Sequence, residues 1–348
     1  MQRTEIAARL LGPDSIPLWV PLLTHYRRDN GAAVVDTDRM ARHMAQVRPS
    51  VRSWMLAGST GDGWDISAEQ FDVLLAFAAG SDFGPDVRVL IGALRATTDE
   101  VIALVEKTHA AAGTSASATL EENVDRLARI HWVGLTVCPP VGENVSQDDI
   151  LDHYRAVIAA ARMPLAVYQL PQVTGNTIAP ATMAKLAAEY PEIILFKDSS
   201  GEDVVAESGV DLGGVVRVRG AEGDYAEVLA PLGGPYDGWL LSTGNAFGPH
   251  LRKIARAVSD GAADDAKQVS AELTERVNRL FTAGADAPVG NAFANVNRAV
   301  DHVLAHGAAW RDHETPMLFD GSRLPTEIVA KIAVILDAAG CIPEKGYL

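Results

Sequence analysis

The chain has 348 residues, of which 48% are hydrophobic and 22% are charged, and its formal net charge is −15. This composition is typical of a globular protein with one large α/β domain or two smaller ones. The acidic balance argues against nucleic acid and anionic membranes as partners, because both require clustered Lys and Arg.

The N-terminal stretch MQRTEIAARLLGPDS is too charged for a secretory signal. Runs of about 18 apolar residues, which a membrane span needs, are absent from the sequence. The two cysteines, Cys138 and Cys341, provide neither a disulfide framework nor a CxxC zinc motif. We therefore expect a cytoplasmic protein with no membrane partner.

Short apolar runs of strand length alternate with Ala-rich helical patterns over the first 245 residues. Eight such runs cover residues 16–26, 51–61, 87–94, 131–140, 164–171, 192–201, 215–223 and 236–246. Between them, Ser67 with Gln70 and Thr97 with Glu100 fit capping boxes, and Ser146 opens another helix. Eight such units predict a (β/α)8 TIM barrel, since a doubly wound sheet has fewer strands and a GxGxxG first turn, which is absent here.

The last hundred residues, roughly, have helical patterns only. We expect a catalytic barrel over residues 1–250 and a helical C-terminal extension, packed on the barrel, over residues 251–348. A helix-like insertion at 119–130 precedes the fourth strand, and its position predicts a lid or a subunit contact.

Three histidines in the extension raise the question of a metal site. His302 and His306 are four residues apart, and His313 is nearby. The pair lacks the glutamate of HExxH and lies beyond the barrel strands, so we expect a solvated helix face and no metal.

Active-site residues of such barrels follow the carboxyl ends of the strands. This rule selects polar residues after strands one, two, five, six, seven and eight of the series. They are Thr24, His25, Ser59, Thr60, Tyr168, Lys197, Glu222, Ser242, Thr243 and Asn245.

Lys197 ends an apolar strand, where a charged residue is unusual. Strand alternation predicts Ile193, Leu195 and Lys197 on one face, with Tyr168 on the neighbouring strand. If that face is the barrel interior, burial lowers the pKa of the amine, and a neutral amine can form a Schiff base while a phenol relays protons. The alternative for Lys197 is an ion pair with Asp198 or another barrel carboxylate, and for Tyr168 it is a core position with a satisfied hydroxyl; neither residue decides alone.

The segment AGSTGDGW (57–64) offers backbone N–H groups and two hydroxyls in a Gly-flanked turn. Such a turn can hold a carboxylate, although an ordinary turn before the next helix explains it equally well.

Together, GSTGD after strand two, YQLPQVTG on strand five, FKDSSG on strand six and STGN after strand eight resemble the dihydrodipicolinate synthase/N-acetylneuraminate lyase family over about residues 16–300. The resemblance implies a lyase in which Lys197 forms a Schiff base with pyruvate or another 2-oxo acid and Tyr168 relays protons. It also implies no external cofactor and a homodimer or homotetramer. The substrate-binding residues expected from it and from the barrel rule are Gly58, Ser59, Thr60, Glu222, Ser242 and Thr24.

Departures from the family pattern bear on the substrate. Dihydrodipicolinate synthases resemble YNVPSRTG with an arginine that holds a second carboxylate, and Val173 at this position argues against that substrate. The bulky strand Gly238-Trp239-Leu240-Leu241, with Trp64 and His25 as an aromatic wall, predicts an aryl or other apolar aldehyde partner for a hydratase-aldolase.

Other functions remain open at this point. Glu222, where an acidic residue contacts substrate hydroxyls, keeps a 2-keto-3-deoxy sugar acid dehydratase as an alternative, and a non-catalytic 2-oxo acid binding protein is a third. A phosphate-binding barrel is disfavoured because Glu222 and Asp224 would repel a phosphate.

Overall fold

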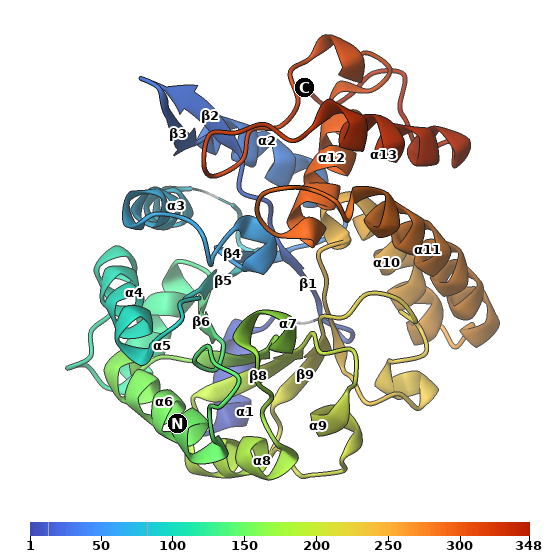
Figure 1. The fold of residues 1–348 in the computed structure, drawn as a ribbon. Coiled ribbons are helices and arrows are strands. Elements are labelled where there is room, and N and C mark those ends of the chain that lie inside the picture. The colour runs from blue at the N-terminus through green and yellow to red at the C-terminus, as the bar shows by residue number, and fades with distance from the viewer. Residues whose placement is uncertain (13, 82) are drawn as a thin grey trace.

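The computed structural model describes residues 1–12, 14–81 and 83–348. Within these ranges, eight parallel strands close into a barrel in the order β1-β10-β9-β8-β7-β6-β5-β4 (Figure 1), which confirms the predicted TIM barrel. The strands are β1 (Leu18–Pro21), β4 (Ser53–Leu56), β5 (Arg88–Gly92), β6 (Trp132–Val137), β7 (Leu165–Gln169), β8 (Ile193–Asp198), β9 (Val216–Arg219) and β10 (Gly238–Leu240).

Helices follow the strands and surround the barrel. They are α2 (Thr37–Val47), α3 (Ala68–Gly80), α4 (Thr98–Ala112), α6 (Gln147–Ala161), α7 (Pro171–Thr174), α8 (Pro180–Glu189), α9 (Val204–Glu207), the 3-10 turn Ala230–Leu232 and α10 (Gly244–Ser259). The predicted capping boxes of Ser67 with Gln70 and Thr97 with Glu100 are present, and Ser146 caps α6. Each cap satisfies backbone N–H groups that the first helical turn leaves without partners.

Three further helices follow: α11 (Ala263–Gly284), α12 (Ala292–His306) and α13 (Thr326–Ala338). Helix α10 runs through residue 250, where the sequence suggested a boundary. In Figure 1, α12 lies beside β1 and β4 at the rim of the barrel. None of the helices in the described ranges is long and apolar enough to cross a membrane.

Two features near the N-terminus were not predicted. Helix α1 (Arg3–Leu10) inserts Ile6 and Leu10 into the same buried cluster as the interior barrel residues Trp19 and Leu195. An antiparallel hairpin of β2 (Tyr26–Asp29) and β3 (Ala32–Val35) follows β1. The apolar run 16–26 therefore contains one barrel strand and the beginning of a second element.

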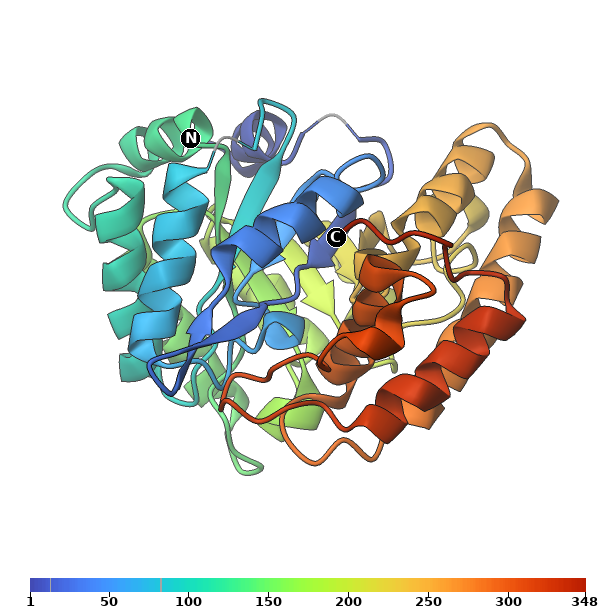
Figure 2. The same ribbon diagram turned by 90° about the horizontal axis from the view of Figure 1, so that it is seen from above.

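The insertion at 119–130 forms α5 (Leu120–Arg129), and its expected role as a lid is wrong. Figure 2 shows α5 and α1 together at one end of the molecule, and Arg9 on α1 forms an ion pair with Asp125 on α5. Val124 packs with Ile6 in the cluster at the amino ends of the strands. Because α5 is at the end opposite to the predicted site, it cannot cover that site.

Strand β8 departs from simple alternation. Its pairing with β7 shifts register, so that Leu165 faces Ile193 whereas Ala166 faces Leu195. Ile194 packs with Leu195 in the inner cluster, and Ile193 packs in the outer one. The predicted placement of Ile193 beside Leu195 and Lys197 is therefore wrong, because the irregularity moves Ile193 to the other face.

Candidate functional site

Lys197 and Tyr168 lie next to each other at the carboxyl ends of β8 and β7. They are partners in the strand register, and each is almost fully buried. The Lys197 Nζ is 3.8 Å from the centroid of the Tyr168 ring. This is the amine and phenol pair that the strand pattern predicted.

The environment of Lys197 favours the neutral amine. Burial lowers the pKa of Lys197 to about 7, and the Glu222 carboxylate opposes that shift. Burial also raises the pKa of the Cys138 thiol, which keeps it uncharged and unable to act as a counter-ion. Among the residues with described positions, no carboxylate is within the 4.0 Å of an ion pair with Lys197.

The alternative partner, Asp198, is bound elsewhere. One of its carboxylate oxygens accepts from the Ser200 N–H at 2.9 Å, and Gln169 Nε2 is 3.3 and 3.4 Å from the two oxygens. The ion pair that sequence left open for Lys197 is thus replaced by hydrogen bonds on the other side of the strand. Burial raises the pKa of the Tyr168 phenol, which therefore holds its proton at neutral pH.

The GSTGD segment forms a tight turn after β4. Ser59–Gly61 is a 3-10 turn, and Asp62 ends it in the left-handed region with φ 59°. Ser59 and Thr60 line the cavity above Lys197, and Asn291 Nδ2 donates to Ser59 Oγ at 3.1 Å. Two hydroxyls thus face the same space as the amine.

Gly58 and Thr24, which we expected to contact substrate, lie behind this turn. Thr24 Oγ1 donates to the Gly61 carbonyl at 2.7 Å. A Cβ at Gly58 would come within 2.3 Å of Met55 Cε. Thr24 supports the turn through this hydrogen bond, Gly58 packs against Met55, and neither residue lines the cavity.

Glu222 after β9 and Ser242 after β10 also line the cavity, on the part of the rim between the GSTGD turn after β4 and Lys197 on β8. The Glu222 carboxylate accepts from Ser242 Oγ at 2.7 Å, from the Thr243 N–H at 2.9 Å and from the Tyr225 hydroxyl at 3.1 Å. Three donors hold the carboxylate in place, so it presents a fixed negative charge to the cavity.

The cavity has a volume of about 460 Å³, a size that suits a small organic molecule. The C-terminal helices supply one of its walls, which sequence reasoning did not find. Phe281 and Phe293 stack edge to face there, with ring centroids 4.8 Å apart. The residues of this wall are Asn278, Phe281, Thr282, Asn291 and Phe293. The aromatic pair is apolar and lines the same cavity as Val173, so these residues favour an apolar group.

Trp64 and His25 do not form the expected aromatic wall. Trp64 packs behind Tyr168 against Leu94 and Leu170. His25 lines a separate cavity of about 500 Å³, together with His302, His306 and His313. His302 is buried and its Nε2 is 3.0 Å from the Trp310 carbonyl, which corrects the expectation of a solvated face.

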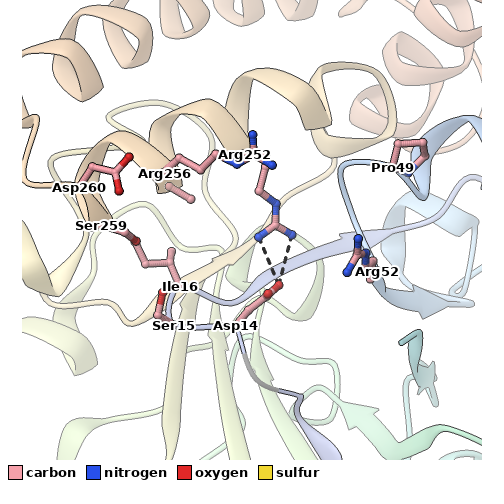
Figure 3. A pocket seen from close by; sticks show the side chains of 10 residues that line it. Asp14, Ser15, Ile16, Pro49, Arg52, Arg252, Arg256, Ser259 and Asp260 are labelled. Atoms are coloured by element: carbon pink, nitrogen blue, oxygen red, sulfur yellow. Dashed lines mark hydrogen bonds and ion pairs between the residues drawn. The ribbon is translucent and has the colours of Figure 1, made fainter. Parts of the chain in front are cut away.

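A third cavity lies at the amino end of the barrel (Figure 3). It holds about 280 Å³ and is crossed by the ion pair of Arg252 with Asp14, at 3.2 Å. Asp14 precedes β1 and Arg52 precedes β4, so this cavity is on the face away from Lys197. It contains none of the predicted site residues.

One group in the described residues meets the spacing of a metal site: His25, His43 and Asp301, whose ligand atoms lie within 4.8 Å of one another. Asp301 is already bound by Arg39 and by the Tyr347 hydroxyl. A cation there would have to compete with the Arg39 guanidinium for the same carboxylate, so these residues do not fit a metal ion.

Comparisons with known proteins agree with this geometry. The profile of the dihydrodipicolinate synthetase family matches residues 18–305. The 4-hydroxy-tetrahydrodipicolinate synthase of Prochlorococcus marinus (strain MIT 9313) is 27% identical over 274 residues, which are 78% of this chain and 82% of that protein. Its counterpart in Corynebacterium diphtheriae is 26% identical over 264 residues, covering 74% and 77%.

Among solved structures, YagE, a prophage protein of E. coli K12 in complex with pyruvate, is similar with a TM-score of 0.72 and 20% identity. The match covers 93% of this chain and 98% of that one. The KD(P)GA structure from T. tenax matches with a TM-score of 0.68 and 19% identity, over 93% and 98%. At these identities the likeness shows the shared fold.

Proposed function

The chain belongs to the dihydrodipicolinate synthetase family and is a lyase, and from this premise we propose that it acts on a 2-oxo acid through an imine on Lys197. The observation that carries the proposal is the buried amine, with its pKa lowered to about 7, packed over Tyr168 in a cavity with Ser59 and Thr60. Ser59 and Thr60 would hold the C1 carboxylate.

The chemistry starts with attack of the neutral Lys197 amine on the C2 carbonyl. Tyr168 gives a proton to the oxygen of the carbinolamine, which leaves as water, and a C=N bond forms. The Tyr168 phenolate then takes the proton of the C4 hydroxyl, the electron pair of the C3–C4 bond moves into the imine to leave an enamine, and the C4 fragment departs as an aldehyde. Protonation at C3 and hydrolysis return the amine and release the shorter 2-oxo acid. External cofactors are not needed for these steps.

The apolar wall favours a hydratase-aldolase whose aldehyde partner is aryl or otherwise apolar. Phe281, Phe293 and Val173 are beside the space that the C4 substituent would fill. Val173 also leaves no cation for a second carboxylate at this position. The 2-keto-3-deoxy sugar acid dehydratase is the second candidate, because the fixed Glu222 carboxylate and Ser242 suit substrate hydroxyls.

Reduction by borohydride in the presence of pyruvate tests the imine. We expect a pyruvate-sized mass increase located on Lys197 by peptide analysis, lost in Lys197→Ala and kept in Lys185→Ala, which removes an exposed lysine. Lack of any adduct with pyruvate and with longer 2-oxo acids would refute the mechanism.

Turnover assays then separate the candidates. Aryl aldehydes with pyruvate should be substrates, and Phe293→Ala should raise KM for them more than for a small polar aldehyde. Turnover of deoxy sugar acids alone would favour the dehydratase. An adduct with no turnover of any substrate would favour a binding protein. We also propose a homodimer or homotetramer, which light scattering would measure.

A further inference from the structure

Helix α12 carries two charged side chains, Arg298 and Asp301, that are almost completely buried, at 2% and 3% exposure. They are three residues apart and therefore lie on neighbouring positions of one helix face. Buried charges are costly unless they are paired. Arg298 is paired with Asp62 in the GSTGD turn, and Asp301 is paired with His43 on α2, which in turn contacts Asn245 after β10.

The hydrogen bonds that run from Arg298, which we call the first arm, reach the GSTGD turn. The Arg298 guanidinium is hydrogen bonded to the Asp62 carboxylate, which also accepts from the Tyr26 hydroxyl at 2.8 Å. Another contact, at 3.4 Å, goes to the Thr24 carbonyl, and Thr24 Oγ1 in turn donates to the Gly61 carbonyl. Arg298 thus holds both the end of β1 and the turn that carries the cavity-lining hydroxyls.

The hydrogen bonds that run from Asp301, which we call the second arm, reach the loop after β10. The Asp301 carboxylate is 2.9 Å from His43 Nδ1, and His43 Nε2 is 3.0 Å from Asn245 Oδ1. Asn245 Nδ2 donates to the Ser242 carbonyl at 2.8 Å and to the Pro21 carbonyl at 2.9 Å. Through Asn245 this arm holds the backbone of Ser242, whose hydroxyl donates to Glu222.

The hydrogen bonds fix the orientation of the His43 ring. Asn245 uses its NH2 group on two carbonyls, and its Oδ1 also accepts from the Leu23 N–H at 3.2 Å, so the oxygen must face His43. His43 Nε2 therefore donates to Asn245 Oδ1, while Nδ1 faces the Asp301 carboxylate at 2.9 Å and the Tyr347 hydroxyl at 3.3 Å. Contacts at both nitrogens fix the orientation of the ring between α12 and Asn245.

Asp301 is suited to this role. Although burial alone would raise the pKa of Asp301, the neighbouring His43 and Arg39 hold it well below its usual range. The carboxylate therefore stays ionised and keeps His43 oriented.

We propose that α12 is a positioning helix for catalysis, in which Arg298 sets the GSTGD turn through Asp62 and Asp301 sets the Ser242–Glu222 side through His43 and Asn245. This inference rests on the proposed function, because the two sides are defined by the parts of the substrate that they would bind. The first side would bind the carboxylate of the 2-oxo acid, and the second would face the remainder of the substrate. The two arms should therefore affect different kinetic steps.

The experiment measures two quantities for each variant: the pyruvate concentration that gives half-maximal trapping of Lys197 by borohydride, and kcat for complete turnover. For the first arm, Asp62→Asn combined with Arg298→Gln removes both charges and keeps hydrogen-bonding groups. We expect its half-maximal pyruvate concentration to rise about tenfold or more. For the second arm, Asp301→Asn and His43→Gln should leave that concentration within about twofold and lower kcat about tenfold.

Arg252→Gln is the matched control, because it breaks an ion pair at the far end of the barrel (Figure 3). Both quantities should stay at the wild-type values. Circular dichroism verifies that each variant is folded, and His43→Gln, which removes no buried carboxylate, serves if Asp301→Asn fails to fold.

Equal effects of the two arms on both quantities, or no effect of either, would overturn the proposal and leave α12 with a structural role only. Failure of the proposed function is a separate result: the wild-type protein would then form no adduct. In that case, pyruvate affinity from calorimetry replaces trapping as the measure of the first arm, and unchanged affinity in the double variant would overturn it.

Discussion

Gly220, at the end of β9, is beside the aliphatic part of Lys197. A Cβ at this position would be 2.7 Å from Lys197 Cε and 2.0 Å from Ser199 Oγ. Both distances are shorter than real contacts allow, so Gly220→Ala must displace the amine from its place over Tyr168. We expect the rate of imine formation with pyruvate to fall roughly tenfold or more, because small displacements of a nucleophile are costly.

Gly80 provides the comparison for that substitution. A Cβ there meets nothing within 4 Å, so Gly80→Ala should form the adduct at the wild-type rate. A Gly220→Ala protein with normal trapping kinetics would show that the lysine has more freedom than its packing indicates.

The polar residues at the carboxyl ends of the strands could each be predicted from the sequence. Lys197, Tyr168, Ser59 and Glu222 meet because parallel strands of a barrel end at a common rim, which is a local rule that sequence can follow. Asn291 was missed, since its contact with Ser59 spans 232 positions and no local pattern marks it. The apolar Phe281 and Phe293 were missed for the same reason.

At the scale of elements, patterns showed which segments are strands and helices but not how each one is packed. The irregularity in β8 is invisible in a uniformly apolar run, because every residue from Ile193 to Phe196 suits either face. Likewise, the sequence of α5 is amphipathic and so indicates that one side is buried. It does not indicate against what, because the partner α1 is more than a hundred residues away along the chain.

Arg3 anchors helix α1 to the barrel. Arg3 donates to five backbone carbonyls, those of Ala187, Tyr190, Ile193, Leu212 and Gly213, and so joins the helix to the segments flanking β8. Arg3→Ala leaves these buried acceptors without their donor. We expect the free energy of unfolding to fall by about 2–4 kcal/mol, measured by chemical denaturation.

The same helix contains the control. Arg9 forms a half-exposed ion pair with Asp125, and such pairs contribute little. Arg9→Ala should therefore change the free energy of unfolding by less than about 1 kcal/mol. If both substitutions had the same small effect, Arg3 would not anchor α1.

At the scale of the whole molecule, Lys197 links stability to pH. The folded protein binds the Lys197 proton with a pKa of about 7, whereas the unfolded chain binds it with a pKa near 10.5. Below pH 7 both states are protonated, and the folded state bears the full cost of a buried ammonium, at most roughly 5 kcal/mol. Between pH 7 and 10.5 only the unfolded chain keeps the proton, so this cost is progressively relieved as pH rises.

Replacement of the lysine by an uncharged side chain of similar length removes that cost. Lys197→Met should therefore be more stable than the wild-type protein at pH 6, and the difference should shrink by more than half at pH 9, as measured by denaturant unfolding at both values. Lys185→Met should show no such trend, because this lysine is exposed. If Lys197→Met raised the free energy of unfolding equally at both pH values, the cause would be better packing and not removal of the buried charge. If Lys197→Met raised the free energy of unfolding mainly at low pH, the fold would be giving up stability to bury an amine at the proposed catalytic position.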